Sequence, residues 1–156
     1  MATKLSKNFT LEELTVTSQK ANNTPTAEAK KHLQELCTDC LQSLRDFYGK
    51  GISINSGYRS AAVNKLVGGS NTSAHSVGYA ADTKPSNGDM RPYQQTVLEW
   101  AKTHKFDQII LEYPTNYVAR WIHIGYKNRA GAQRRQILYT TNGKSYPTIT
   151  NKFYLK

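Results

Sequence analysis

The fold is decided by the stretch FDQIILEYPTNYVARWIHIGY, residues 106–126. Its two ends, 106–112 and 121–126, are rich in isoleucine and aromatic residues, which predicts two strands. The segment between them is short and contains a proline, so a hairpin is the natural connection. Alternation along the second strand places Ile122 and Ile124 toward the core.

The polar residues of these two strands predict a site on the opposite face. His123 points away from the core, and Glu112 shares its face with Gln108 and Ile110. If the paired positions of the two strands sum to an odd number, Glu112 and His123 lie on the same face and close together. An even register separates them, and a histidine that is simply exposed is the alternative reading.

The sequence on either side predicts an α+β domain. Apolar residues at steps of three and four predict a long helix over residues 27–48, capped by Thr26. Its stripe comprises Leu33, Leu36, Cys40, Leu44 and Phe47. Shorter elements are expected as helices at 9–14, 60–67 and 91–104, strands near 52–56 and 79–83, and an edge strand at 136–140. We therefore expect a small, mostly antiparallel sheet with helices packed on one face.

Two cysteines, Cys37 and Cys40, form an isolated CxxC pair. A zinc ribbon needs a second pair, and no thioredoxin-like βαβ pattern surrounds this one. We expect both thiols to be reduced and buried on the long helix.

Length and composition indicate one soluble domain. The chain has 156 residues, of which 38% are hydrophobic and 21% charged, with a mean hydropathy of -0.64. We expect a monomer with a single domain over residues 1–156 and a turn-rich basic segment at about 127–156. The first residues lack the apolar run of a signal peptide, and no uncharged stretch has the length of a membrane span. We therefore expect synthesis in a cytoplasm.

The net charge of +10 is concentrated in the last third of the chain. No acidic residue follows Glu112, whereas eight basic residues do: Arg120, Lys127, Arg129, Arg134, Arg135, Lys144, Lys152 and Lys156. Such a surface attracts polyanions, among them nucleic acid, anionic cell-wall polymer and acidic lipid head groups. Nucleic acid is the least favoured of these, because the segment has no groove-entering helix or RNA-binding signature.

A second polar pair, His75 and Asp82, has a spacing that suits two metal ligands on either side of a turn. Asp82 follows the apolar run 79–81, where a buried carboxylate needs a partner charge or a metal. An ordinary loop histidine is the alternative. Together with His123, the pair predicts the three protein ligands of an open zinc site, with the Glu112 carboxylate nearby as a general base.

Four motifs of the chain resemble those of the zinc D-Ala-D-Ala carboxypeptidase and L-alanyl-D-glutamate endopeptidase family of bacteria and phages. They are SGYRS at 56–60, SAHSVGYAAD at 73–82, FDQIILE at 106–112 and WIHIGY at 121–126. The resemblance runs from about Phe9 to the strand near Tyr139, and it implies the fold shared with hedgehog signalling domains.

The resemblance also implies roles for individual residues. The ligands of one Zn²⁺ per chain fall on His75, Asp82 and His123. The arginine that holds the substrate carbonyl or the developing oxyanion falls on Arg59. Many members place the catalytic acid three residues before the last histidine, where this chain has Arg120. The subgroup that the chain resembles most has a glutamate at the end of the earlier strand instead, and that residue matches Glu112.

We therefore expect a zinc peptidase that hydrolyses an amide bond in peptidoglycan stem peptides, as a D-Ala-D-Ala carboxypeptidase or an endolysin-type endopeptidase. Glu112 and Arg59 are expected to be catalytic. The substrate cleft is expected to be lined by Arg59, Tyr58, Ser73 and Tyr126.

The same resemblance gives expectations about partners and location. The basic segment is expected to bind anionic cell-wall polymer, and the enzyme is expected to reach the wall after release from a cytoplasm, as a phage lysin does. The alternative function is a non-catalytic, zinc-containing module that binds cell wall, and Arg120 at the position of the catalytic acid favours it.

Overall fold

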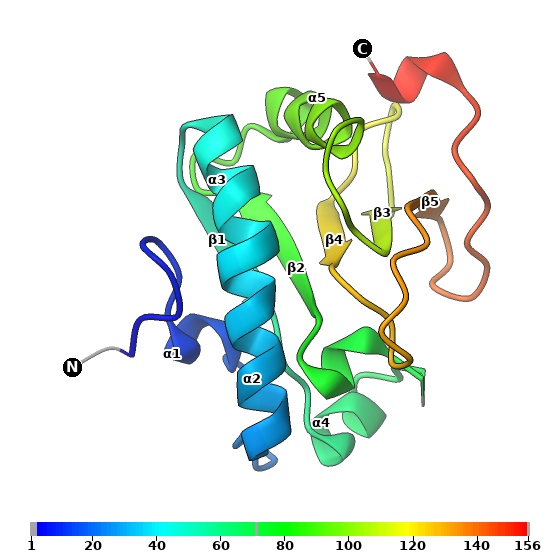
Figure 1. Ribbon diagram of the computed structural model, residues 1–156. Coiled ribbons are helices and arrows are strands. Elements are labelled where there is room, and N and C mark those ends of the chain that lie inside the picture. Colours follow the sequence, from blue (N-terminus) through cyan, green and yellow to red (C-terminus); the bar gives the residue numbers. More distant parts are fainter. Residues whose placement is uncertain (1–2, 71, 156) are drawn as a thin grey trace.

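A five-stranded sheet forms the centre of the molecule, with strand order β1-β2-β4-β3-β5 (Figure 1). The computed structural model describes residues 3–70 and 72–155, and its strands are β1 (Ile52–Ser56), β2 (Ala80–Pro85), β3 (Gln108–Glu112), β4 (Trp121–Gly125) and β5 (Gln136–Thr140). Neighbouring strands pair antiparallel, except that β5 runs parallel to β3 at the edge. The predicted α+β class, the mostly antiparallel sheet and the edge strand are confirmed.

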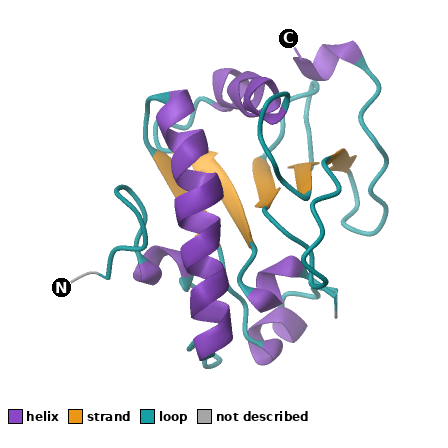
Figure 2. Cartoon of the chain, in the orientation of Figure 1, coloured by secondary structure: helices purple, strands orange, loops and turns teal. Residues whose placement is uncertain are grey.

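The helices gather mainly on one face of this sheet (Figure 2). They are α1 (Leu11–Leu14), α2 (Ala27–Glu35), the π-helical turn η1 (Leu36–Leu41), α3 (Gln42–Tyr48), α4 (Ala61–Leu66), α5 (Met90–Ala101), and the 3-10 turns η2 (Ala74–Val77) and η3 (Lys152–Leu155). The long helix made by α2, η1 and α3 crosses in front of β1 and β2 (Figure 1). Within the described ranges, no helix combines the length and apolarity needed to cross a membrane.

Capping residues mark the ends of the helices, with hydroxyl side chains at the start and a glycine at the end. Thr10 and Glu13 form a capping box at α1, and the Thr26 side chain accepts a hydrogen bond from the Ala29 amide at the start of α2. Gly49 ends α3 in the left-handed conformation, at φ 74°. The long helix over 27–48 is thereby confirmed.

The π-helical turn changes which side chains of the long helix are buried. Within η1 the Gln42 amide bonds to the Cys37 carbonyl, five residues back, so the apolar stripe shifts relative to a regular helix. Phe47 is consequently 50% exposed, and its predicted place in the core is wrong. Tyr48 packs against the Tyr93 ring instead, with the ring centroids 5.1 Å apart.

Both cysteines are free and buried, as predicted. Burial raises the pKa of Cys37 to about 12, and burial also raises the pKa of Cys40 well above its ordinary value. Because the thiolate is the reactive form, neither cysteine is a nucleophile at neutral pH.

The core lies between the helices and one face of the sheet. Ile109 and Leu111 of β3 and Ile122 and Ile124 of β4 are fully buried there, as the alternation predicts. The opposite face of the central strands is therefore available for polar side chains, and the site described below occupies it.

Gly78 lets the chain reverse between η2 and β2. Its φ is 89°, and a β-carbon added there would lie 2.6 Å from the Ala29 carbonyl oxygen of α2. Both the backbone conformation and the space therefore require glycine at this position.

We expect Gly78→Ala to lower the free energy of unfolding by about 3 kcal/mol, the sum of left-handed strain and a backbone clash. Gly88→Ala is the matched control, because Gly88 has φ 78° but open space around its α-carbon; it should lose only about 1 kcal/mol. Urea denaturation of both variants measures the difference, and equal losses would show that the contact with α2 contributes nothing.

Candidate metal centre and cavity

Three side chains from three different elements meet on the polar face of the sheet. His75 comes from η2, Asp82 from β2 and His123 from β4, and Asp82 and His123 are direct cross-strand partners. His75 Nε2 lies 3.2 Å from His123 Nδ1 and 3.3 Å from Asp82 Oδ1, and His123 Nδ1 lies 3.4 Å from the same oxygen. All three residues are buried. The structure thus brings together the three residues predicted as metal ligands.

The hydrogen bonds around the cluster leave lone pairs at its centre. His75 Nδ1 donates to the Gly57 carbonyl at 2.8 Å, which leaves Nε2 as the lone-pair nitrogen facing the other two residues. Asp82 Oδ1 is buried and has no hydrogen-bond donor. Converging acceptors repel one another unless a cation or proton lies between them, so the cluster has the electrostatics of a cation site.

The donor set and its spacing fit zinc. Two imidazole nitrogens and one carboxylate oxygen are ordinary zinc ligands, and atoms bound tetrahedrally at about 2.0–2.1 Å lie about 3.3 Å apart. The three observed separations, 3.2, 3.3 and 3.4 Å, agree with that spacing. Three protein ligands leave one position of a tetrahedral ion open, which is the arrangement of catalytic rather than structural zinc.

Arg59 forms hydrogen bonds that hold residues of the cluster in place. Its Nη2 donates to Asp82 Oδ2 at 3.1 Å, its Nε donates to the Ser56 hydroxyl at 3.1 Å, and its backbone amide donates to the His75 carbonyl at 3.0 Å. Burial alone would raise the pKa of Asp82, but the adjacent His75 and His123 rings outweigh burial and hold that pKa below its ordinary value. Asp82 is therefore ionised and oriented, with one oxygen on Arg59 and the other toward the histidines.

Glu112 lies on the same face as His123, because the β3–β4 register is odd. Glu112 pairs with Trp121 and Ile110 with His123, so both sums are 233 and the register prediction is confirmed. The Trp121 indole Nε1 donates to Glu112 Oε2 at 2.6 Å. Burial, followed by the negative charge of Asp82, raises the pKa of Glu112 to about 7, against the opposing effects of His123 and the Trp121 hydrogen bond.

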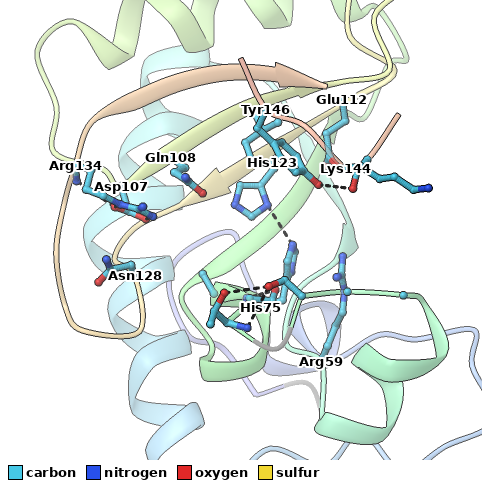
Figure 3. A pocket seen from close by; sticks show the side chains of 18 residues that line it. Arg59, His75, Asp107, Gln108, Glu112, His123, Asn128, Arg134, Lys144 and Tyr146 are labelled. Carbon is cyan, nitrogen blue, oxygen red and sulfur yellow. Dashed lines mark hydrogen bonds and ion pairs between the residues drawn. The ribbon is translucent and has the colours of Figure 1, made fainter. Parts of the chain in front are cut away.

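A cavity of about 600 Å³ opens over the cluster (Figure 3). Of the predicted site residues, Arg59, Ser73, His75, Glu112 and His123 line it. The Ser73 hydroxyl also accepts a hydrogen bond from the His75 amide at the start of η2.

Sequence reasoning missed a large part of the lining. Additional residues come from the glycine-rich loop before η2, from the start of β3 and from beyond β4: Gly68, Gly69, Ser70, Thr72, Ala74, Asp107, Gln108, Ile110, Asn128, Arg134, Gly143, Lys144 and Tyr146. Gln108 and Ile110 could have been found, since alternation puts them on the Glu112 face. The residues beyond β4 carry no comparable signal, because their place depends on how β5 joins the sheet.

Tyr58 and Tyr126 do not line this cavity, in contrast to the prediction that they line the cleft together with Arg59 and Ser73. Tyr126 continues the alternation of β4 and follows Ile124 to the helix-covered side, where its ring lies 6.3 Å from that of Tyr79. Tyr58 is 5% exposed and belongs to the core, and its amide donates to the Leu14 carbonyl.

Arg120 also lies outside the cavity lining. Its backbone amide donates to the Glu112 carbonyl at 2.9 Å, and its guanidinium carbon lies 6.0 Å from the centre of the Tyr113 ring. The position that favoured a non-catalytic module therefore does not face the candidate metal centre.

Arg134 and Arg135 are two of several basic residues after Glu112 that have structural contacts. Arg134 binds the buried Asp107 carboxylate through Nε and Nη2, both at 2.8 Å. Arg135 donates to the Ala101 and His104 carbonyls at the end of α5. Removing these charges would disturb the fold, so they are poor probes of binding to a wall polymer.

Comparison with known proteins gives one family. The family model described as Peptidase M15 matches residues 7–125, which include every residue of the His75, Asp82 and His123 cluster together with Arg59 and Glu112. No curated protein matches the chain.

Proposed function

The chain belongs to the peptidase M15 family of zinc-dependent peptidases, and from this premise we propose that it hydrolyses an amide bond in peptidoglycan stem peptides. The observation that carries the proposal is the cluster of His75, Asp82 and His123, whose two histidines line the same cavity as Glu112 and Arg59. A ligand set, a carboxylate and a guanidinium in one cavity are the groups that metal-assisted amide hydrolysis needs.

In the proposed reaction three sets of side chains have separate roles. His75, Asp82 and His123 would hold the zinc ion, which supplies the Lewis acidity that makes water a nucleophile near neutral pH. Glu112 accepts the proton of the attacking water and passes it to the leaving amine. Arg59 lines the cavity beside Asp82, where its guanidinium can donate to the oxygen that becomes negative as the carbonyl is attacked.

Trp121 is placed to hold Glu112 in the proposed reaction. Its 2.6 Å hydrogen bond fixes one carboxylate oxygen, and its ring packs 5.4 Å from that of Tyr113. We infer that this bond orients the general base without contacting the substrate.

We expect Trp121→Phe to lower kcat about tenfold while KM changes less than twofold, because a freed carboxylate samples unproductive positions. Steady-state kinetics on a soluble stem peptide measures both constants. Trp100→Phe, which removes a 3.1 Å bond from the other tryptophan to Ser43 in the core, controls for loss of stability. Equal effects of the two substitutions would exclude a positioning role.

Mass spectrometry of muropeptides tests the proposed function. Purified protein loaded with zinc is incubated with purified cell walls, and the soluble products are identified by mass. Loss of a terminal D-Ala identifies a carboxypeptidase, and new internal amino termini identify an endopeptidase. Walls that bind the protein but yield no new product would instead identify a non-catalytic wall-binding module and overturn the proposal.

A further inference from the structure

The cavity wall beside Glu112 is built by a part of the chain outside the region that matches the family. Gly143, Lys144 and Tyr146 line the cavity, whereas the family match ends at residue 125. They lie in the turn that follows β5, which we call the 141–146 turn. This part of the cavity wall therefore lies outside the region that the family model matches.

The 141–146 turn is held by its own hydrogen bonds. The Gly143 amide donates to the buried Thr140 hydroxyl at 2.8 Å, and the amides of Lys144 and Ser145 donate to Asn142 Oδ1 at 2.8 and 3.0 Å. The Tyr146 hydroxyl donates to the Gly143 carbonyl at 3.1 Å. These bonds hold the backbone that carries Lys144 at the wall of the cavity.

Contact with Tyr113 fixes the turn against the edge of the sheet that carries Glu112. Gly143 has φ 71°, and a β-carbon added to it would lie 2.6 Å from the Tyr113 hydroxyl. The Tyr113 amide donates to the Thr140 carbonyl at 2.8 Å. Because Tyr113 directly follows Glu112, the turn and the proposed general base share one support.

The two cations that line the cavity besides Lys144 each have an acidic partner. Arg59 is paired with Asp82 at 3.1 Å and Arg134 with Asp107 at 2.8 Å. Among the described residues, Lys144 is the lining cation for which no acidic partner is present. A positive charge without a partner on the wall of a cleft attracts an anionic group of the ligand.

Figure 3 shows where that group would lie. The Lys144 side chain leaves the turn beside Glu112 and extends away from His75 and His123, on the side of the view where Arg59 lies. Asp107, Asn128 and Arg134 lie on the opposite side of the cluster. The cavity therefore extends to both sides of the candidate metal centre, and its positive end is the one with Lys144.

We propose that Lys144 is a specificity-determining residue. It binds a free carboxylate of the peptide substrate that lies on one side of the scissile amide. The inference rests on the proposed function and adds to it the class of substrate: peptides with a carboxylate near the cleaved bond. Peptides in which that carboxylate is a carboxamide lose the charge-assisted contact and bind less tightly.

Paired synthetic peptides test the inference. One stem peptide carries its free carboxylates, and two others replace either the C-terminal or the D-glutamyl carboxylate by a carboxamide. We expect wild-type kcat/KM to fall about five- to tenfold for one of the two carboxamides, which is the range of a partly solvent-exposed charged contact. Lys144→Met should lose that discrimination through KM, and Lys144→Arg should keep it.

Lys152→Met is the matched control, because it removes the same charge from an exposed residue that does not line the cavity. Discrimination that survives in Lys144→Met, or is lost equally in Lys152→Met, would overturn the inference while leaving the peptidase function intact. Wild-type protein that cleaves none of the three peptides would overturn the proposed function, and the inference with it.

Discussion

Glu112→Gln is expected to lower kcat by about 10²–10⁴-fold, the range in which a positioned general acid or base contributes to rate. Glutamine has nearly the same shape and can still accept the hydrogen bond that Trp121 donates at 2.6 Å, but it cannot take a proton from water. Zinc content should stay near one ion per chain, because Glu112 is not one of the three clustered ligands. Stopped assays on a soluble stem peptide, with metal analysis of the same preparation, measure both quantities.

The control is Glu99→Gln, which removes a carboxylate from the exposed ion pair with Lys102 on α5. It should retain full activity. If Glu112→Gln is as active as Glu99→Gln, Glu112 is not the general base and another group must move the proton.

Asp82→Asn is expected to weaken zinc binding by at least about 100-fold, since the loss of outer contacts alone costs 10–100-fold in other metal sites. The substitution removes the one negatively charged residue of the three and leaves the Arg59 guanidinium without its carboxylate at 3.1 Å. At zinc concentrations near 1,000 times the wild-type Kd, the ion should stabilise wild-type protein by about 4 kcal/mol and the variant by about 1.4 kcal/mol. This readout does not depend on activity.

Thermal unfolding with and without zinc, together with competition against a chelator of known affinity, measures the loss. Asp46→Asn serves as the control, because Asp46 is exposed on α3 and its carboxylate accepts a hydrogen bond from the Gln42 side chain one turn earlier. If zinc raises the unfolding temperature of Asp82→Asn as much as that of the wild type, Asp82 is not a zinc ligand. The two histidines then do not belong to the proposed three-ligand site.

The chemistry of the site could be predicted from sequence where it depends on strand alternation. Placing Ile122 and Ile124 in the core put His123 on the other face, and an odd register was enough to bring Glu112 beside it. The same rule also places Tyr126 on the core side, which contradicts the expectation that it lines the cleft. That error came from treating closeness in sequence to His123 as closeness to the site.

Other features depended on tertiary contacts that a local pattern does not contain. The π-helical turn that exposes Phe47 adds one residue to a single turn of the helix. The apolar residues on either side of it keep a regular helical spacing, so the sequence does not reveal the turn. The 141–146 turn reaches the cavity because β5 pairs in parallel with β3, a contact between segments 28 residues apart, as in the pairing of Gln108 with Gln136. Propensity and spacing predict that a turn exists, but long-range pairing decides what it faces.

The inert cysteines of the long helix make the protein convenient to label. Cys37 and Cys40 are buried and hold their protons at neutral pH, so they react slowly with maleimides and iodoacetamides. The thiol of Ser145→Cys, at an exposed position, would react ahead of both while Cys37 and Cys40 stay unchanged. A fluorophore attached there sits on the 141–146 turn and would report the arrival of a peptide in the cavity as a change in emission.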